Sequence, residues 1–545
     1  MAGGTGPLLI LGRFGARLEA SRTLQGGHLA AETRDFTEAD RAQLAERGIS
    51  EPEAARQLGL LATPPPQAVL VRPCTLGDGV RQIELAERAE LIAAHAEAAS
   101  AGRIRSFIPA SGAASRMFKD LLAAQALPTS ITPAEVRALA AEGRSDAASL
   151  AQLAELLPRF AFAERLAEQL RSRGLDPTKV SSDGPWQALL SALLDTDGLD
   201  YANAPKGLLP FHRNHGVTRT AFEEHLREVP EVASDKAGRA RIHFTVSSEH
   251  RERFERAFAR SRGALDFGAS VQDVSFSEQL PATDTLAGAV GGGAFRDDAG
   301  RLVFRPAGHG ALLANLHALS ADLVFIKNID NVAVQALRGE GVIWAKLLLG
   351  LVARYHARGG ALAARLRAGD ASAASDAAAF LAETTGEALP SDADVNAWLL
   401  ARFARPWRVA GMVPNTGEPG GGPFWVRGEG GAVTAQIVES AQVDMGNPQQ
   451  GDRFRHGTHF NPVFIACALR GTDGQSVTLD RFVDDAAVIV TRKSHGGRDL
   501  LALERPGLWN GAMARWNTVF VEVPLAVFTP VKTVFDLLRP EHQGD

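Results

Sequence analysis

Residues 104–119 read IRSFIPASGAASRMFK, and they decide the fold class. The first five residues form an apolar run, a loop of small residues follows, and Arg116 opens a helical pattern. Strand, small-residue loop and helix start are together typical of the first unit of a nucleotide-binding α/β sheet. Further strand-like runs lie at 242–246 and 323–326, separated by helical sequence. We therefore predict an α/β protein with a Rossmann-like mixed central sheet and helical insertions.

Residue composition and hydrophobic spacing change along the chain, and these changes predict its domain organisation. Alanine- and leucine-rich stretches with i, i+3, i+4 spacing indicate helices, whereas Gly-rich loops and β-like runs mark the last third. The predicted regions are an N-terminal helical region (1–100), a nucleotide-binding α/β core (101–130 and 201–335), a helical insertion (131–200), a second helical block (336–405) and a β-rich C-terminal part (406–545).

Composition excludes several classes of protein. The chain has 545 residues, with 58 Lys+Arg against 63 Asp+Glu and a net charge of −5, which argues against nucleic acid as a partner. Two cysteines, Cys74 and Cys467, are too few for a disulfide framework or a Cys-rich zinc site. The apolar run 342–352 contains Lys346 and is shorter than the roughly 20 residues that span a bilayer. The run 7–11 is too short for a secretory signal. We expect a cytoplasmic protein without a membrane partner.

Two motifs carry chemistry suited to phosphate. In the loop 110–116 small residues let backbone N–H groups approach an anion, and Arg116 adds a fork of donors. The segment APKGLLP at 204–210 holds Lys206 between prolines, where it would act on phosphate as a point charge. Tight packing of the loop and a solvated surface lysine are the alternatives.

A third motif suggests a metal site. The segment NIDN at 328–331 follows the apolar run 323–326, so Asp330 lies just past the carboxyl end of a predicted buried strand. Ligands of open α/β sheets bind at that end. An aspartate there suits Mg²⁺, which takes one or two carboxylates together with phosphate oxygens and water. The alternative is an Asx-turn that closes the strand.

Histidines and tryptophans offer weaker signals. His212, His215 and His225 lie close in sequence, but a fourth ligand at suitable spacing is missing, which favours ordinary polar histidines over a metal site. Trp509 and Trp516 are seven residues apart, and we interpret them as packing residues rather than a base-stacking site.

The motifs occur in an order that resembles sugar-nucleotide pyrophosphorylases, especially the UDP-glucose and UDP-sugar branch. The loop at 110–117 resembles the A-G-G-x-G-T-R-M signature of these enzymes, and residues 205–210 resemble their P-K-x-L-L-P element. Later counterparts, in chain order, are GHG (308–310), NIDN (328–331), GGG (420–422) with QIVESAQV (436–443), HFN (459–461) and FTPVKT (528–533) with DLL (536–538). The whole chain also resembles an uncharacterised bacterial family, domain of unknown function 4301.

This resemblance implies a fold of the nucleotide-diphospho-sugar transferase type and a nucleotidyltransferase activity. A nucleoside triphosphate, with UTP favoured, and a sugar 1-phosphate would form an NDP-sugar and release pyrophosphate. The residues implied as catalytic are Arg116, Lys206 and Lys532, and Asp330 would ligate Mg²⁺. Those implied to bind the nucleotide are Ser111, Gly112, Ala113, Gln279, Gly308 and His309. Those implied to bind the sugar phosphate, within the C-terminal part, are Gly421, Glu439 and Asn461.

The chain departs from the signature at Ser111 and Ala114, which replace glycines, so side chains there would be strained if the loop needs a positive φ. Two other functions stay open. One is a catalytically silent sugar-nucleotide-binding or scaffold protein, and the other is a glycosyltransferase of related fold. The sequence gives no indication of the oligomeric state or of which sugar is used.

Overall fold

The computed structural model describes residues 36–264, 271–390, 394–417, 420–428 and 431–544. The run 7–11 lies outside the described residues. The chain divides into two compact units, a smaller one of residues 1–67, 280–311 and 484–512 and a larger one of residues 68–279, 312–483 and 513–545.

A mixed, mostly parallel sheet forms the centre of the larger unit. Its strands, in spatial order, are β2 (Thr75–Leu76), β3 (Gly79–Arg81), β20 (Asn517–Glu522), β13 (Trp407–Pro414), β17 (Phe464–Ala468), β12 (Leu323–Lys327), β4 (Ile104–Pro109), β7 (Arg239–Val246) and β8 (Val271–Glu278), and β16 (His459–Phe460) pairs with β13. Along this path β17 runs antiparallel to both of its neighbours, and the other pairs are parallel. The predicted fold class is confirmed, because the runs at 104–108, 242–246 and 323–326 lie in β4, β7 and β12.

The strand order creates a switch point beside β4. From β4 the chain adds β7 and then β8 on one side, and it later returns to place β12 on the other side. In open α/β sheets, ligands bind outside the carboxyl ends of the strands at such a switch point.

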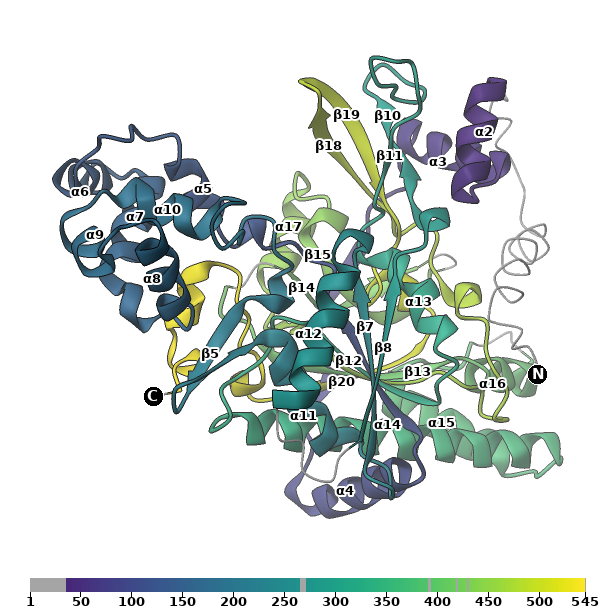
Figure 1. Cartoon of the computed structure of the whole chain (residues 1–545). Coiled ribbons are helices and arrows are strands. Elements are labelled where there is room, and N and C mark those ends of the chain that lie inside the picture. Colours follow the sequence, from purple (N-terminus) through teal and green to yellow (C-terminus); the bar gives the residue numbers. More distant parts are fainter. Residues whose placement is uncertain (1–35, 265–270, 391–393, 418–419, 429–430, 545) are drawn as a thin grey trace, which may run out of the picture. The chain divides into compact units, whose positions relative to one another are not determined.

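Helices cover the sheet and extend the larger unit. The helices of the larger unit outside segment 119–194 are α4 (Leu85–Ser100), α11 (Ala221–Ala233), α12 (Arg251–Ala264), α13 (Leu312–Ala318), α14 (Arg338–Arg367), α15 (Ala373–Thr385), α16 (Val395–Phe403) and α17 (Pro448–Arg455), of which α17 packs on β1. The long α14 packs across β12, β13 and β17, with α4 alongside it (Figure 1). Within the described residues we find no helix with the length and apolarity that a membrane span requires.

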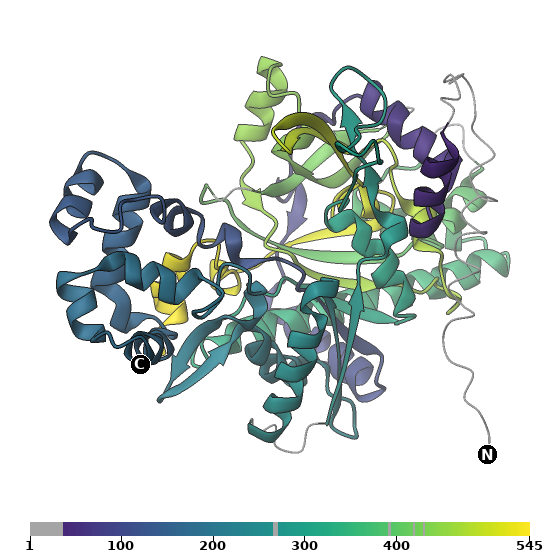
Figure 2. The same ribbon diagram turned by 45° about the horizontal axis from the view of Figure 1, so that its top comes forward.

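The predicted helical insertion forms its own bundle. Within the predicted bounds 131–200 it contains α6 (Pro133–Ala141), α7 (Ser145–Leu156), α8 (Ala163–Ser172), α9 (Pro177–Asp183) and α10 (Trp186–Leu194), and α5 (Lys119–Ala124), from the segment predicted as core, packs on α7. Leu150 and Leu153, three residues apart on α7, are fully buried, as the helical spacing predicts. The C-terminal segment lies against these helices (Figure 2), where Phe535 contacts Phe160 with ring centroids 6.3 Å apart.

Small sheets complete the two units. In the larger unit β1 (Val69–Pro73), β14 (Gly421–Arg427) and β15 (Val433–Glu439) form one antiparallel sheet, and β5 (Pro210–Asn214) pairs with β6 (Val217–Thr220). The smaller unit contains α2 (Glu38–Arg47), α3 (Glu51–Ala62), β9 (Thr285–Leu286), β10 (Gly288–Ala289), β11 (Phe304–Arg305), β18 (Ile489–His495) and β19 (Arg498–Glu504). Of these strands, β14, β15, β18 and β19 lie in the predicted β-rich C-terminal part.

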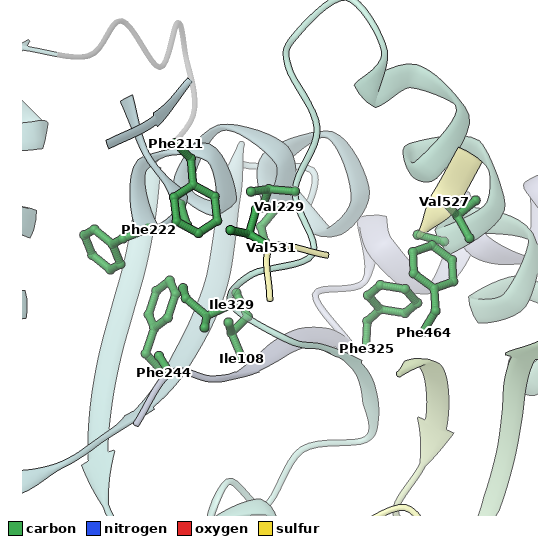
Figure 3. Close-up of a cluster of buried hydrophobic side chains, with 14 of the residues drawn as sticks. Ile108, Phe211, Phe222, Val229, Phe244, Phe325, Ile329, Phe464, Val527 and Val531 are labelled. Atoms are coloured by element: carbon green, nitrogen blue, oxygen red, sulfur yellow. The ribbon is translucent and has the colours of Figure 1, made fainter. Parts of the chain in front are cut away.

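The hydrophobic core reaches the carboxyl edge of the central sheet. Ile108, near the end of β4, and Ile329, just past β12, are both buried and gather with Phe244 and Phe222 (Figure 3). Burial of these side chains anchors the base of each loop that leaves this edge, so that the polar residues further along the loops start from fixed positions.

Candidate functional site

Hydrogen bonds from a backbone N–H and from an imidazole fix the turn that carries Asp330. The N–H of Ile329 donates to the carbonyl oxygen of Pro109 at 3.2 Å, which joins the turn to the end of β4. His225 of α11 donates from Nε2 to the Ile329 carbonyl oxygen, also at 3.2 Å. Burial lowers the pKa of the His225 imidazole to about 4, so the ring is neutral near pH 7. Asp330 therefore projects from a fixed turn.

Lys206 and Asp330 meet in an ion pair, although 124 residues separate them in sequence. The distance from Nζ to Oδ2 is 2.5 Å, and the side chains are 15% and 19% exposed. The β4 loop positions the lysine, because the N–H of Lys206 donates to Gly112 O and the N–H of Ala114 donates to Ala204 O, each at 3.0 Å. The structure thus brings together two residues for which the sequence predicts a phosphate role and a metal role.

The loop at 110–116 presents small residues and one cation. Ser111, Gly112, Ala113 and Arg116 are all exposed. Neither Ser111 nor Ala114 is among the described residues with positive φ, so the side chains that replace the signature glycines adopt ordinary backbone conformations. The loop accommodates these substitutions without strain.

Asn331 has a role that the sequence reasoning missed. Its Oδ1 accepts the N–H of Thr529 at 2.9 Å, and its Nδ2 donates to Val527 O at 3.2 Å. Asn331 also forms a β-bridge with Pro530 and is almost fully buried. The buried amide therefore ties the loop that carries Lys532 to the turn that carries Asp330. The signal in the sequence is the NIDN motif, of which Asn331 is the last residue.

The residues predicted to bind the sugar phosphate lie together at the end of β14. Gly421 pairs with Glu439 across β14 and β15, and a Cβ on this glycine would lie 3.0 Å from Glu439 Cγ. Asn461, buried and next to β16, donates its N–H to Gly421 O at 2.8 Å. Its Oδ1 accepts the N–H of Val463 at 3.1 Å, which fixes the orientation of the amide. The carboxylate of Glu439 and the oriented amide of Asn461 thus both lie beside Gly421.

Lys532 lies beside Phe460 of β16. Its Nζ is 5.7 Å from the ring centroid of Phe460 and 5.8 Å from that of Phe528. Its backbone N–H donates to Asp536 Oδ2 at 2.8 Å. Because Asn461 follows Phe460 directly, Lys532, which is predicted to be catalytic, lies near a residue that is predicted to bind the sugar phosphate.

The residues predicted to face the base divide between the two units. Gln279 follows β8 at the end of a segment of the larger unit. Within the smaller unit, the His309 ring stacks on Trp509 with centroids 4.0 Å apart, and its Nδ1 accepts the N–H of Leu508 at 2.9 Å. Gly308 has φ +72°, a conformation that favours glycine.

Comparison with known proteins identifies the family. The model of the family described as "Domain of unknown function (DUF4301)" matches residues 37–543. The chain belongs to the DUF4301 family. A comparison with curated proteins finds no match.

Solved structures with similarity to this DUF4301 chain include two pyrophosphorylases. The uridine diphosphate N-acetylglucosamine pyrophosphorylase from Trypanosoma brucei has 14% identity and a TM-score of 0.48, with 93% of this chain and 80% of that chain covered. The UDP-glucose pyrophosphorylase from Leishmania major has 12% identity and a TM-score of 0.40, with 92% and 79% covered.

The donors near Asp330 are compatible with Mg²⁺ only if phosphate oxygens complete the set. Among the described residues, we find no group of three or more His, Cys, Asp or Glu side chains arranged to hold a metal. One carboxylate with phosphate oxygens and water is nevertheless a donor set that Mg²⁺ accepts. The three histidines considered above do not converge, because His212 bonds Glu224 and His542, His225 bonds Ile329, and His215 lies in the β5–β6 turn.

A large cavity of about 1220 Å³ lies elsewhere in the larger unit. Its walls come from β3, β20, the end of α15, α16 and the β14–β15 hairpin, with Trp398 and Trp425 among them. The predicted site residues are absent from its described lining. Both tryptophans are covered by arginines, Trp398 by Arg402 and Trp425 by Arg72.

Proposed function

We propose that the protein is a nucleotidyltransferase that joins a nucleoside triphosphate, with UTP favoured, to a sugar 1-phosphate and releases pyrophosphate. The observation that carries the proposal is the Lys206–Asp330 pair beside the β4 loop, at the switch point of the sheet. A cation for phosphate and a carboxylate for a metal ion there lie within reach of one triphosphate.

The reaction needs positioning and charge stabilisation rather than covalent catalysis. An oxygen of the sugar phosphate would attack the α-phosphorus in line, the bond to the bridging oxygen would break, and pyrophosphate would leave. Arg116 and Lys206 would hold the triphosphate, so Lys206 would exchange Asp330 for a phosphate oxygen. Asp330 would then hold Mg²⁺, which when bound neutralises charge on the phosphate oxygens. Lys532 would contact the α-phosphate or the sugar phosphate.

The remaining roles follow the chemistry of each group. Glu439 would accept hydrogen bonds from sugar hydroxyls, and Asn461 would orient the sugar phosphate beside Gly421. Gln279 and the Gly308–His309 pair would face the base. These substrates are small cytoplasmic metabolites, so we place the reaction in the cytoplasm without a nucleic-acid or membrane partner.

A second candidate is a sugar-nucleotide-binding protein without catalytic activity. The same ion pair favours it, because a carboxylate already neutralised by Lys206 is a weaker ligand for a metal ion. The two candidates differ in turnover rather than in binding.

The test is pyrophosphate release by the purified protein with Mg²⁺, across a matrix of nucleoside triphosphates and sugar 1-phosphates. We expect release with one specific pair and, since oriented charges stabilise the transition state, a loss of about 100-fold or more in Asp330→Ala and Lys532→Ala. The matched control is Lys236→Ala, which removes an exposed lysine outside the site and should retain full activity. If folded protein that still binds nucleotide released no pyrophosphate with any pair of substrates, the result would establish the binding protein instead.

A further inference from the structure

The ammonium of Lys532 lies close to two aromatic rings at once. The distances of 5.7 and 5.8 Å from Nζ to the centroids of Phe460 and Phe528 are both within the range of cation–π attraction. The two centroids are themselves 5.2 Å apart, with the ring planes tilted by 41°. We call Phe460 and Phe528 the aromatic slot.

The Phe460 ring of the slot is held by β16. Phe460 is 8% exposed and pairs with Val413 of β13. Gly420 leaves room for this ring, since a Cβ there would lie 2.4 Å from its edge. Displacement of the Phe460 ring would therefore disturb the end of the central sheet.

The Phe528 ring is held by the turn that carries Asp330. Thr529, the next residue, donates its N–H to Asn331 Oδ1, and Asn331 Nδ2 donates to Val527 O on the other side of the ring-bearing residue. Asn331 directly follows Asp330. The slot is thus anchored on one side to the predicted sugar-phosphate residues and on the other to the predicted metal ligand.

We infer that Phe460 and Phe528 are positioning residues, which fix the Lys532 ammonium where the anionic phosphate of the substrate binds. A lysine side chain loses rotamer entropy when it is held in one position, and the two ring faces restrict it before substrate arrives. The inference rests on the proposed function and extends it, because neither ring needs to touch the substrate.

Fluorination of the rings tests the electrostatic part of this role. Fluorine withdraws electron density from the ring face with little change in shape, so a residue that only packs should tolerate it. We expect kcat/KM to fall stepwise when Phe460 or Phe528 is replaced by 4-fluoro-, 3,5-difluoro- and 3,4,5-trifluorophenylalanine, by about tenfold over the series. KM for the sugar 1-phosphate should rise along the same series.

The matched control is the same series at Phe454 of α17. Phe454 stacks on Phe424 with centroids 5.4 Å apart, so it has an aromatic partner like the residues of the slot. Its fluorination should leave kcat/KM unchanged. If kcat/KM stayed constant along the fluorination series at Phe460 and Phe528, in protein that releases pyrophosphate, the inference would be overturned.

A second measurement does not depend on activity. Lysines carrying ¹³C-methyl groups keep their charge and give separate NMR signals, and Lys532→Arg identifies the signal of Lys532. In the slot that signal should be shifted upfield by the ring currents, and Phe460→Leu should reduce the shift. A Lys532 signal at the chemical shift of a free lysine would contradict the placement of its ammonium in the aromatic slot. A shifted signal together with silence across the substrate matrix would keep the slot and overturn the proposed function.

Discussion

Two lysine–carboxylate pairs lie at the end of β12, and they differ in burial and in geometry. Lys327 Nζ contacts both carboxylate oxygens of Glu228 on α11, at 2.6 and 2.9 Å, and the side chains are 8% and 6% exposed. Lys206 Nζ contacts one oxygen of Asp330, and these side chains are 15% and 19% exposed. The first pair joins a strand to a helix, whereas the second lies in the turns beside the carboxyl ends of β4 and β12 and is more exposed to solvent.

Because the two pairs differ in burial, they differ in the free energy that separation of their charges costs. Burial by itself would raise the pKa of the Glu228 carboxyl, but the charge of Lys327 and the hydrogen bonds from its ammonium outweigh burial and lower the pKa. Separation of this pair would leave two uncompensated charges in the interior. Lys206 and Asp330 retain more access to solvent, so the separation of their charges costs less. The comparison shows two similar ion pairs at one strand end that differ in burial, and the proposed function gives the more exposed pair the role of binding ligand.

The largest expected effect is the loss of the buried pair. Lys327→Met leaves Glu228 without its cation and should lower the free energy of unfolding by about 3–5 kcal/mol. Urea denaturation followed by circular dichroism measures this change. The double variant Lys327→Met/Glu228→Leu should recover much of the loss, because it buries no charge. Equal stability of Lys327→Met and Lys206→Met would break the comparison.

Acidification probes the imidazole that lies between the two pairs. The pKa of His225 is about 4 in the folded protein, below the value near 6.5 expected when unfolded. Its contribution to stability is therefore complete above pH 6.5 and is lost as pH falls toward 4, by about 3 kcal/mol in total. His225→Gln retains an N–H donor for Ile329 O but does not titrate, so its unfolding free energy should fall less over this window.

The control for that experiment is His243→Gln. The pKa of His243 is likewise lowered to about 4 by burial, but its ring bonds Ser275 and Ser277 rather than the Asp330 turn. Both variants should flatten the pH profile of stability, and His225→Gln should retain nucleotide binding, because it keeps the donor for Ile329 O. An unchanged pH profile in His225→Gln would contradict the prediction.

The smallest expected effect on stability is at the accessible pair. Lys206→Met should change the free energy of unfolding by about 1 kcal/mol or less, as for ion pairs with access to solvent. Pyrophosphate should raise the melting temperature of the wild-type protein through preferential binding to the folded state, and this rise should disappear in Lys206→Met. Thermal denaturation with and without pyrophosphate measures both quantities. A rise retained in the variant would assign the anion to another position.

The sequence by itself determined the local elements and the fold class. The strand, loop and helix start at 104–119, the buried strand before Asp330 and the helices of the insertion follow from side-chain periodicity and loop composition, which act over a few residues. The structure confirms each of them. The order of the motifs also indicated which residues belong together, with their roles still predictions.

Only the tertiary structure decided the contacts between distant segments. The Lys206–Asp330 pair spans 124 residues and the Asn331–Thr529 bond spans 198, and neither distance leaves a periodic signal. The grouping of residues 280–311 with 36–67 and 484–512 is likewise invisible in the sequence. The physical reason is that such contacts depend on strand order and on which side chains the buried core brings to one edge of the sheet, and these are properties of the packed chain rather than of any local stretch.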